Sequence, residues 1–174
     1  MQKFKDRWEI QANWQLLFPI LGLIGLLFSS FLLGKRLILG ILKFTETHNF
    51  YFPLLSIITV LIFTALLFFT LKIFIPLEKK WNVTYRWELI AIFIAFAVTG
   101  STAARISDPI IQLIGFDRES TSGWIYWPLR IFLIFPVYQI ILLIVGWLFG
   151  QFKFFWWFEK KMLRRMGFAR FLKD

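Results

Sequence analysis

Four long apolar stretches, separated by short polar segments, dominate the chain. They run over residues 14–34, 51–71, 87–104 and 126–152. About 20 helical residues, each rising about 1.5 Å, cross a hydrocarbon core about 30 Å thick. Because lipid offers no hydrogen-bonding partners, each stretch is expected to satisfy its backbone internally as a helix. The pattern therefore predicts an all-α membrane protein with four transmembrane helices.

Three motifs occur twice, in the same order. The pairs are RWEIQANWQL and KWNVTYRWEL, YFPL and YWPL, and KIFIPLEKK and KFFWWFEKK, at separations of 73, 75 and 81 residues. Ordered matches of this kind indicate an internal repeat. Residues 1–79 would form the first two-helix hairpin and residues 80–174 the second. Because each copy crosses the membrane twice, we expect a tandem parallel repeat, with both copies inserted in the same sense.

The tail, residues 153–174, differs in character from the four stretches. Its apolar side chains recur at Phe155, Phe158, Met162 and Met166, with basic side chains between them. This spacing predicts a C-terminal amphipathic interfacial helix whose apolar side enters the inner leaflet. The alternative is a tail that packs on the protein's own connectors.

The charge distribution predicts an orientation. The formal net charge is +10, and most Lys and Arg residues fall in the N-terminal segment, the connector between the second and third stretches, and the tail. Because positive residues are retained in the cytoplasm, both termini are expected on the cytoplasmic side of a bacterial inner membrane. Charge at segment ends favours anionic lipid headgroups, and not nucleic acid, as the partner. The expected interfacial anchors are Trp8, Trp14, Trp81, Trp87, Trp156 and Trp157.

The sequence offers little material for catalysis. It has no cysteine, and its one histidine, His48, lies in an outer loop. No metal-ligand cluster or nucleophile motif is present, and no acid falls in the middle of a stretch, which argues against a proton pump. We expect no cofactor, no metal and no catalytic residue. Whether the chain is an enzyme stays open, with a non-enzymatic role favoured.

Small residues in the third stretch predict a helix–helix seam. Ala97 and Ser101 form one pair four positions apart, and Gly100 and Ala104 form another. Small side chains at this spacing let two helix backbones approach closely. The seam would hold either another helix of this chain or a helix of another subunit.

A second candidate site combines Arg105, Asp108 and Arg130 at the outer face. Arg105 and Asp108 are three residues apart and could pair on one helical face. Arg130 follows YWPL within an apolar stretch, where a charge needs a partner. The possible partners are Asp108, Asp117, Glu119 and a lipid phosphate. Three interpretations remain open: an internal ion pair, a lipid-headgroup contact and a catalytic anion clamp.

The second half resembles a known family. Over residues 80–168, and most specifically in GWLFGQFKFFWWFEKKM, it is similar to small bacterial inner-membrane proteins of unknown function. Some members are labelled prolipoprotein diacylglyceryl transferase-like, which implies lipid transfer to a lipoprotein cysteine. Those transferases have more spans and a His-Gly-Gly stretch, whereas Asn49 and Phe50 follow His48 here. We therefore do not extend that activity to this chain.

Three functions are compatible with these features. The first is a non-enzymatic inner-membrane protein that acts as an accessory or scaffold subunit of a larger envelope complex, with other membrane-protein subunits as partners. The second is a lipid-headgroup-binding protein or lipid-handling enzyme that uses Arg105, Asp108 and Arg130. The third is an oligomeric channel or transporter.

Overall fold

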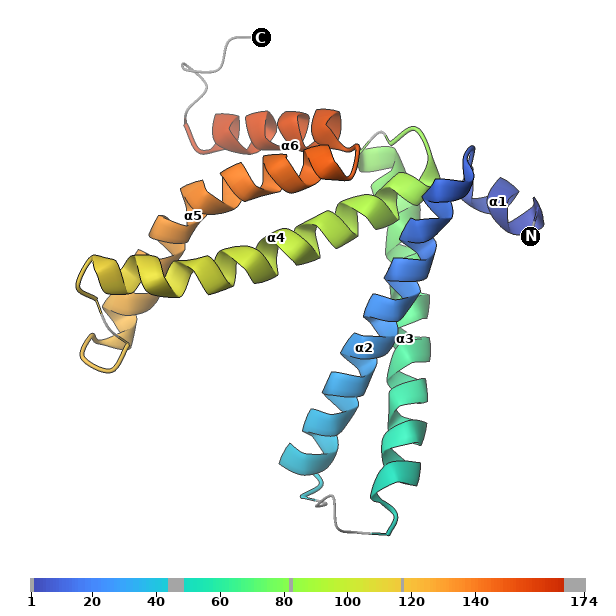
Figure 1. The fold of residues 1–174 in the computed structure, drawn as a ribbon, viewed down its shortest axis with the longest axis horizontal. Coiled ribbons are helices and arrows are strands. Elements are labelled where there is room, and N and C mark those ends of the chain that lie inside the picture. The colour runs from blue at the N-terminus through green and yellow to red at the C-terminus, as the bar shows by residue number, and fades with distance from the viewer. Residues whose placement is uncertain (1, 44–48, 82, 117, 168–174) are drawn as a thin grey trace. The chain divides into compact units, whose positions relative to one another are not determined.

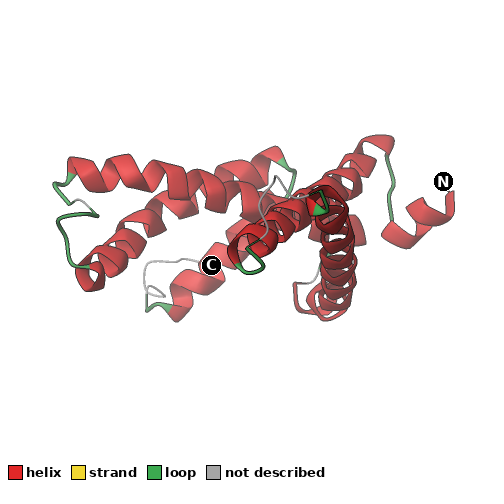
Figure 2. Cartoon of the chain, turned by 90° about the horizontal axis from the view of Figure 1, so that it is seen from below, coloured by secondary structure: helices red, strands yellow, loops and turns green. Residues whose placement is uncertain are grey.

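The computed structural model describes residues 2–43, 49–81, 83–116 and 118–167, and every regular element in these ranges is a helix (Figures 1 and 2). The elements, in chain order, are α1 (Gln2–Trp8), the 3₁₀ helix η1 (Asn13–Leu16), α2 (Leu17–Gly40), α3 (Tyr51–Trp81), α4 (Arg86–Leu113), α5 (Gly123–Leu148) and α6 (Phe152–Arg165). By internal contacts the chain divides into two compact units, Met1–Ile90 and Ala91–Asp174.

Within the described residues, four helices are long and apolar enough to cross a membrane: α2 together with η1, then α3, α4 and α5. This confirms the number and type of the apolar elements predicted from the sequence, and it indicates a membrane protein. The boundaries differ from those predicted. α3 continues ten residues beyond Leu71, and α4 continues beyond the predicted end at residue 104, through Pro109, to Leu113. Loss of one backbone donor at a proline does not end a helix that is supported elsewhere along its length.

In the first unit, α2 and α3 pack closely where α2 carries Gly34. A methyl group at Gly34 would lie 3.2 Å from Thr59 Oγ1 and 3.6 Å from Leu55 Cδ1, so glycine permits the approach. Next to this contact, Ile38, Tyr51 and Leu55 form a buried apolar cluster. Close contact matters here because lipid surrounds both helices, so dispersion and hydrogen bonding, rather than loss of water, hold them together.

Buried residues recur along one side of α2 and of α4. In α2 they are Phe18, Pro19, Ser30, Gly34 and Ile38. Buried residues also occur in α4, 73 positions later in each case, at Ala91, Ile92, Ala103, Ser107 and Ile111. Every position buried in α2 is therefore also buried in α4, which buries further positions as well, and most of the matched side chains differ.

In the second unit, a tight turn folds α6 back onto α5. Gly150 adopts a positive φ of 70°, and the Gln151 N–H donates to the Gly146 carbonyl oxygen at 2.7 Å. This left-handed glycine with a six-to-one hydrogen bond is the common way of ending a helix. The ring of Phe155, which is fully buried, then lies against Gly146, where an added methyl group would overlap it.

Candidate functional site

Arg130 connects α5 to α4 in the second unit. Its Nη2 lies 2.7 Å from Asp108 Oδ1, donates to Ser107 Oγ at 3.0 Å, and reaches the Ala104 carbonyl oxygen at 3.4 Å. The side chain of Arg130 is 16% exposed and that of Asp108 is 55% exposed. The guanidinium group is thus largely buried, and its charge is met by an acid that solvent or headgroups still reach.

Aromatic rings cover the rest of this guanidinium group. Its Nη1 donates to the Tyr126 hydroxyl at 3.5 Å, one helical turn earlier, and its Cζ lies 5.6 Å from the centre of the Trp127 ring. Arg118 lies over the same Trp127 ring at 5.9 Å. A cation over an indole gains about 0.5–1 kcal/mol at an exposed site. Ser107 and Tyr126 were missed by sequence reasoning, although each lies one residue or one turn from a predicted site residue.

The structure shows which of the possible partners of Arg130 contacts its side chain. An internal ion pair with Asp108 is present. Arg105 and Asp108 could have paired by their spacing; in the structure Asp108 pairs with Arg130 of α5, and Arg105 is exposed. Glu119 is also exposed, and Asp117 lies outside the described residues.

The small residues that were predicted to form a helix–helix seam do not lie on the buried side of α4. Ala97, Ser101 and Ala104 are exposed, and a methyl group at Gly100 would meet no atom within 4 Å. The buried side of α4 instead carries Ala95, Thr99, Ala103 and Ser107, again four residues apart. The predicted seam is therefore not a packing surface inside the described part of the chain, and it remains available to another helix.

Two predicted tryptophan anchors behave differently. Trp87 is only 5% exposed: its ring stacks on Phe18 at 5.2 Å and meets Trp14 edge-on at 5.6 Å. It packs within the first unit, and its role as an interfacial anchor stays a prediction. Trp14 is 59% exposed and keeps the surface position that an anchor needs.

The other four predicted anchors keep at least part of their surface. Trp8 is half-buried and packs edge-on against Phe74 at 6.2 Å, and Trp81 is also half-buried. Trp156 and Trp157 are exposed on α6. These positions are compatible with the membrane–water interface, and their placement there stays a prediction.

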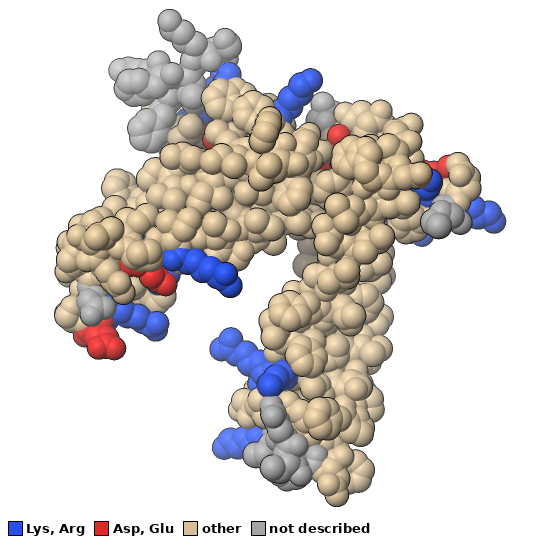
Figure 3. All heavy atoms as spheres, in the orientation of Figure 1, with Lys and Arg blue, Asp and Glu red and all other residues tan. Residues whose placement is uncertain are grey.

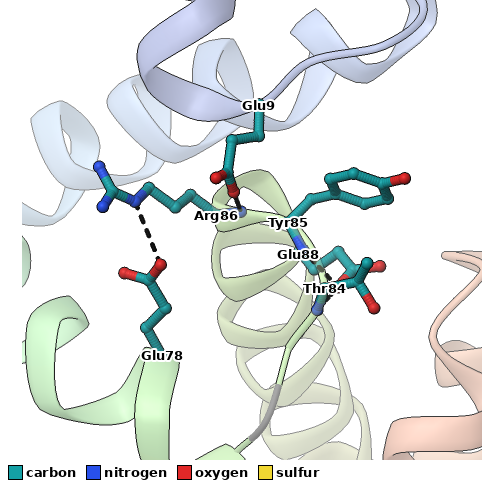
Figure 4. Close-up of polar contacts among 6 residues, drawn as sticks. All are labelled: Glu9, Glu78, Thr84, Tyr85, Arg86 and Glu88. Carbon is teal, nitrogen blue, oxygen red and sulfur yellow. Dashed lines mark hydrogen bonds and ion pairs between the residues drawn. The ribbon is translucent and has the colours of Figure 1, made fainter.

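Acids cap the start of α4 in the first unit (Figure 4). Glu88 Oε2 accepts the backbone N–H groups of Thr84 at 2.9 Å and Tyr85 at 3.1 Å. Glu9 Oε2 accepts the Arg86 N–H at 3.0 Å, and the Arg86 side chain pairs with Glu78 at 3.2 Å. Carboxylates at a helix N-terminus satisfy its free N–H groups and its positive dipole end.

Ahead of α2, Gln15 makes the contacts that Glu88 makes ahead of α4. Gln15 Oε1 accepts the N–H groups of Gln11 at 2.7 Å and Ala12 at 3.0 Å. Each of these three residues lies 73 positions before its counterpart in the Glu88 cap. The two RWEIQANWQL-type motifs therefore form the same local hydrogen-bonding arrangement.

A buried acid in α6 was missed by sequence reasoning. Glu159 is 5% exposed, and its Oε1 has no hydrogen-bond partner among the described residues. Burial raises the pKa of Glu159 from an ordinary value of 4.5 to about 7. Tyr138 of α5 lies within electrostatic range of it, and Gln139 Nε2 lies 3.8 Å from Met162 Sδ beside it. The sequence could have indicated this burial. Glu159 falls four residues after Phe155 and three before Met162, which places it on the apolar side of the helix.

The packed side of α6 faces its own unit. Phe96 of α4 meets Phe155 at 5.2 Å and Phe158 at 5.5 Å, both edge-on, and Met162 contacts Gln139 of α5. The residues expected to enter the inner leaflet are thus in contact with α4 and α5, except Met166, which is exposed. Aromatic rings in edge-on contact stabilise such a docked helix beyond simple burial.

Nothing in this geometry assembles a metal centre: within the described ranges no group of three His, Asp or Glu residues could hold a metal ion. His48 and Glu46 lie outside those ranges. Most of the described acids are engaged: Glu9 and Glu88 cap the start of α4, and Glu78 and Asp108 pair with arginines. Glu159 is buried, and Asp6 and Glu119 are exposed.

Residues 91–170 match the model of a family of unknown function, DUF6787. The match begins where the second compact unit begins and covers α4 from its second turn, α5 and α6. It therefore includes the Arg130 cluster and Glu159. No curated protein and no solved structure matches the chain. Because the function of this family is unknown, the match assigns no activity to the chain.

The Arg130–Asp108 pair predicts a measurable coupling. We expect Arg130→Gln and Asp108→Asn each to lower the free energy of unfolding, and the double variant to lose less than the sum, by about 1 kcal/mol for a half-exposed pair. A double-mutant cycle on thermal unfolding in bilayer discs measures this. Arg105→Gln, the matched control, should stay within about 0.5 kcal/mol of the parent. Additive losses would show that the two residues act separately.

Glu159 predicts a pH dependence of stability. Because the docked α6 holds the Glu159 proton more tightly than the undocked helix does, its contribution is complete below about pH 4.5 and declines as the pH rises through about 7. Glu159→Gln should remove this part of the change in melting temperature between about pH 5 and pH 8. Glu78→Gln is the matched control. Glu78 precedes two lysines in KIFIPLEKK as Glu159 does in KFFWWFEKK, but its side chain is paired with Arg86. A Glu159→Gln profile parallel to that of the parent contradicts the assignment.

Proposed function

We propose that the chain is a non-enzymatic subunit of a larger complex in a bacterial inner membrane, where it acts as an accessory or scaffold protein. The observation that carries the proposal is the exposed small-residue side of α4, formed by Ala97, Gly100, Ser101 and Ala104. In lipid, such a side is suited to close approach by another transmembrane helix. The long sides of the helices show few charges in Figure 3, and charged side chains lie mostly near helix ends.

The Arg130 cluster supports a structural role. A catalytic or binding anion clamp needs donors directed at the place where its ligand will sit. The Arg130 guanidinium is instead directed at Asp108, Ser107 and the Ala104 carbonyl of the neighbouring helix. Its function in this proposal is to hold α5 to α4 by a charge-assisted contact inside the second unit.

The proposal includes a tandem parallel repeat with both termini in the cytoplasm. Two observations support the repeat: the equivalent caps made by Gln15 and Glu88, and the five buried positions of α2 that recur 73 residues later in α4. The orientation is supported by the distribution of Lys and Arg in the sequence.

A lipid-headgroup-binding function is a second candidate, favoured by the surroundings of Trp127. This ring is 49% exposed, and Arg118 and Arg130 both lie over it. Arg118 is exposed, so a lipid phosphate could reach it. In that case the chain would carry lipid without needing a protein partner.

Purification in a mild detergent tests the subunit proposal. We expect stoichiometric membrane-protein partners in the parent, and loss of these partners in Gly100→Leu, because a bulky side chain blocks close helix approach. Gly25→Leu is the matched control, since Gly25 also lies in a span with open space at its Cβ. Mass spectrometry of the purified material, with melting temperature as a folding check, provides the measurement.

Two results would count against the subunit role. A parent chain that purifies as a monomer with retained lipid favours the headgroup-binding function instead. Equal retention of partners by Gly100→Leu and Gly25→Leu removes the α4 side as the contact surface.

A further inference from the structure

The position of α6 along the chain restricts where it can lie. It has 14 residues, about 21 Å of helix, and carries charges in its second half, so it cannot cross a bilayer. A turn of three residues joins it to α5, which is a candidate span. α6 therefore begins where α5 ends, at the surface of the membrane.

The two sides of α6 have opposite chemistry. Phe155 and Glu159 are buried on the docked side, and the rings of Phe96 and Phe155 meet there. The other side, here called the outward face of α6, consists of Lys153, Trp156, Trp157, Lys160, Lys161 and Arg164. Because the one acid of the helix is buried on the docked side, every charge on the outward face is positive.

Aromatic and basic side chains are stacked in pairs on the outward face. Lys160 Nζ lies 5.6 Å from the centre of the Trp156 ring, and Lys161 Nζ lies 4.5 Å from that of Trp157. Both indoles remain exposed, at 45% and 40%. A shallow groove runs along Trp157, Lys161 and Arg164. Indoles prefer the headgroup level, and lysine and arginine there attract anionic lipids.

We propose that the outward face of α6 binds the headgroups of anionic phospholipids in the leaflet at which α5 ends. Docking on α4 and α5 keeps the apolar side of α6 out of the lipid, so binding uses stacked cations and indoles rather than insertion of Phe155 and Phe158. The surface is a feature of the second unit alone and does not depend on the subunit role proposed above.

The first unit contains a natural comparison. Lys79 and Lys80 follow Glu78 at the end of α3, as Lys160 and Lys161 follow Glu159. Glu78, however, has a side chain that is 33% exposed and lies at the surface with Arg86. A negative charge therefore remains beside the first lysine pair, whereas the second pair has its acid buried beneath it.

Lipid selectivity in reconstituted bilayers tests the proposal. The intact chain is placed in phosphatidylcholine vesicles, and the motionally restricted fractions of spin-labelled phosphatidylglycerol and phosphatidylcholine are measured. We expect the preference for phosphatidylglycerol to fall about fivefold or more in Lys160→Gln/Lys161→Gln, given the usual contribution of a lysine near an anionic surface. Lys79→Gln/Lys80→Gln should change it less than about twofold.

A charge-conserving variant separates lipid binding from folding. Lys160→Arg/Lys161→Arg should keep the preference of the parent, because arginine also stacks on indoles and binds phosphate. An unchanged preference in Lys160→Gln/Lys161→Gln, an equal fall in the two glutamine variants, or an equal fall in the arginine variant would each overturn the proposal.

Discussion

Side-chain contact between neighbouring helices is the interaction on which each unit depends. Lipid gives such helices no hydrophobic reason to associate, so short-range packing and polar contacts must hold them together. In the first unit Gly34 of α2 packs closely against Leu55 and Thr59 of α3. In the second unit Ser107 of α4 meets Arg130 of α5.

These two contacts occupy matching places in the repeated motifs. Ser107 lies 73 residues after Gly34, and Arg130 lies 75 residues after Leu55. Asp108 likewise corresponds to Lys35, so the partner that neutralises Arg130 occurs only in the second unit. The second unit thus has a charged, directional contact at the place where the first unit has close packing around a glycine. A largely buried cation without its acid is costly in a membrane, so Arg130 depends on Asp108.

The sequence predicted the four apolar helices because apolar length alone determines what can span a bilayer. It predicted their ends less well, since α3 continues past residue 71 to Trp81 and α4 continues past residue 104 to Leu113. It also did not show that Trp87 and Glu159 are buried. In a membrane protein, apolar residues face both lipid and neighbouring helices, so a periodic pattern shows an apolar side without showing what covers it. Contacts between distant segments, such as Phe96 with Phe155, decide that question.

The central claim is that a two-helix unit occurs twice in the chain, and that both copies are inserted in the membrane with the same orientation. The absence of cysteine from the chain makes it possible to test this with single introduced cysteines. Labelling of intact cells with a membrane-impermeant thiol reagent, at Lys79, Arg164, Leu42 and Ser120 in turn, measures which face each position occupies. The account predicts that Lys79 and Arg164 are protected together while Leu42 and Ser120 react. Reaction at only one of Lys79 and Arg164 would contradict it.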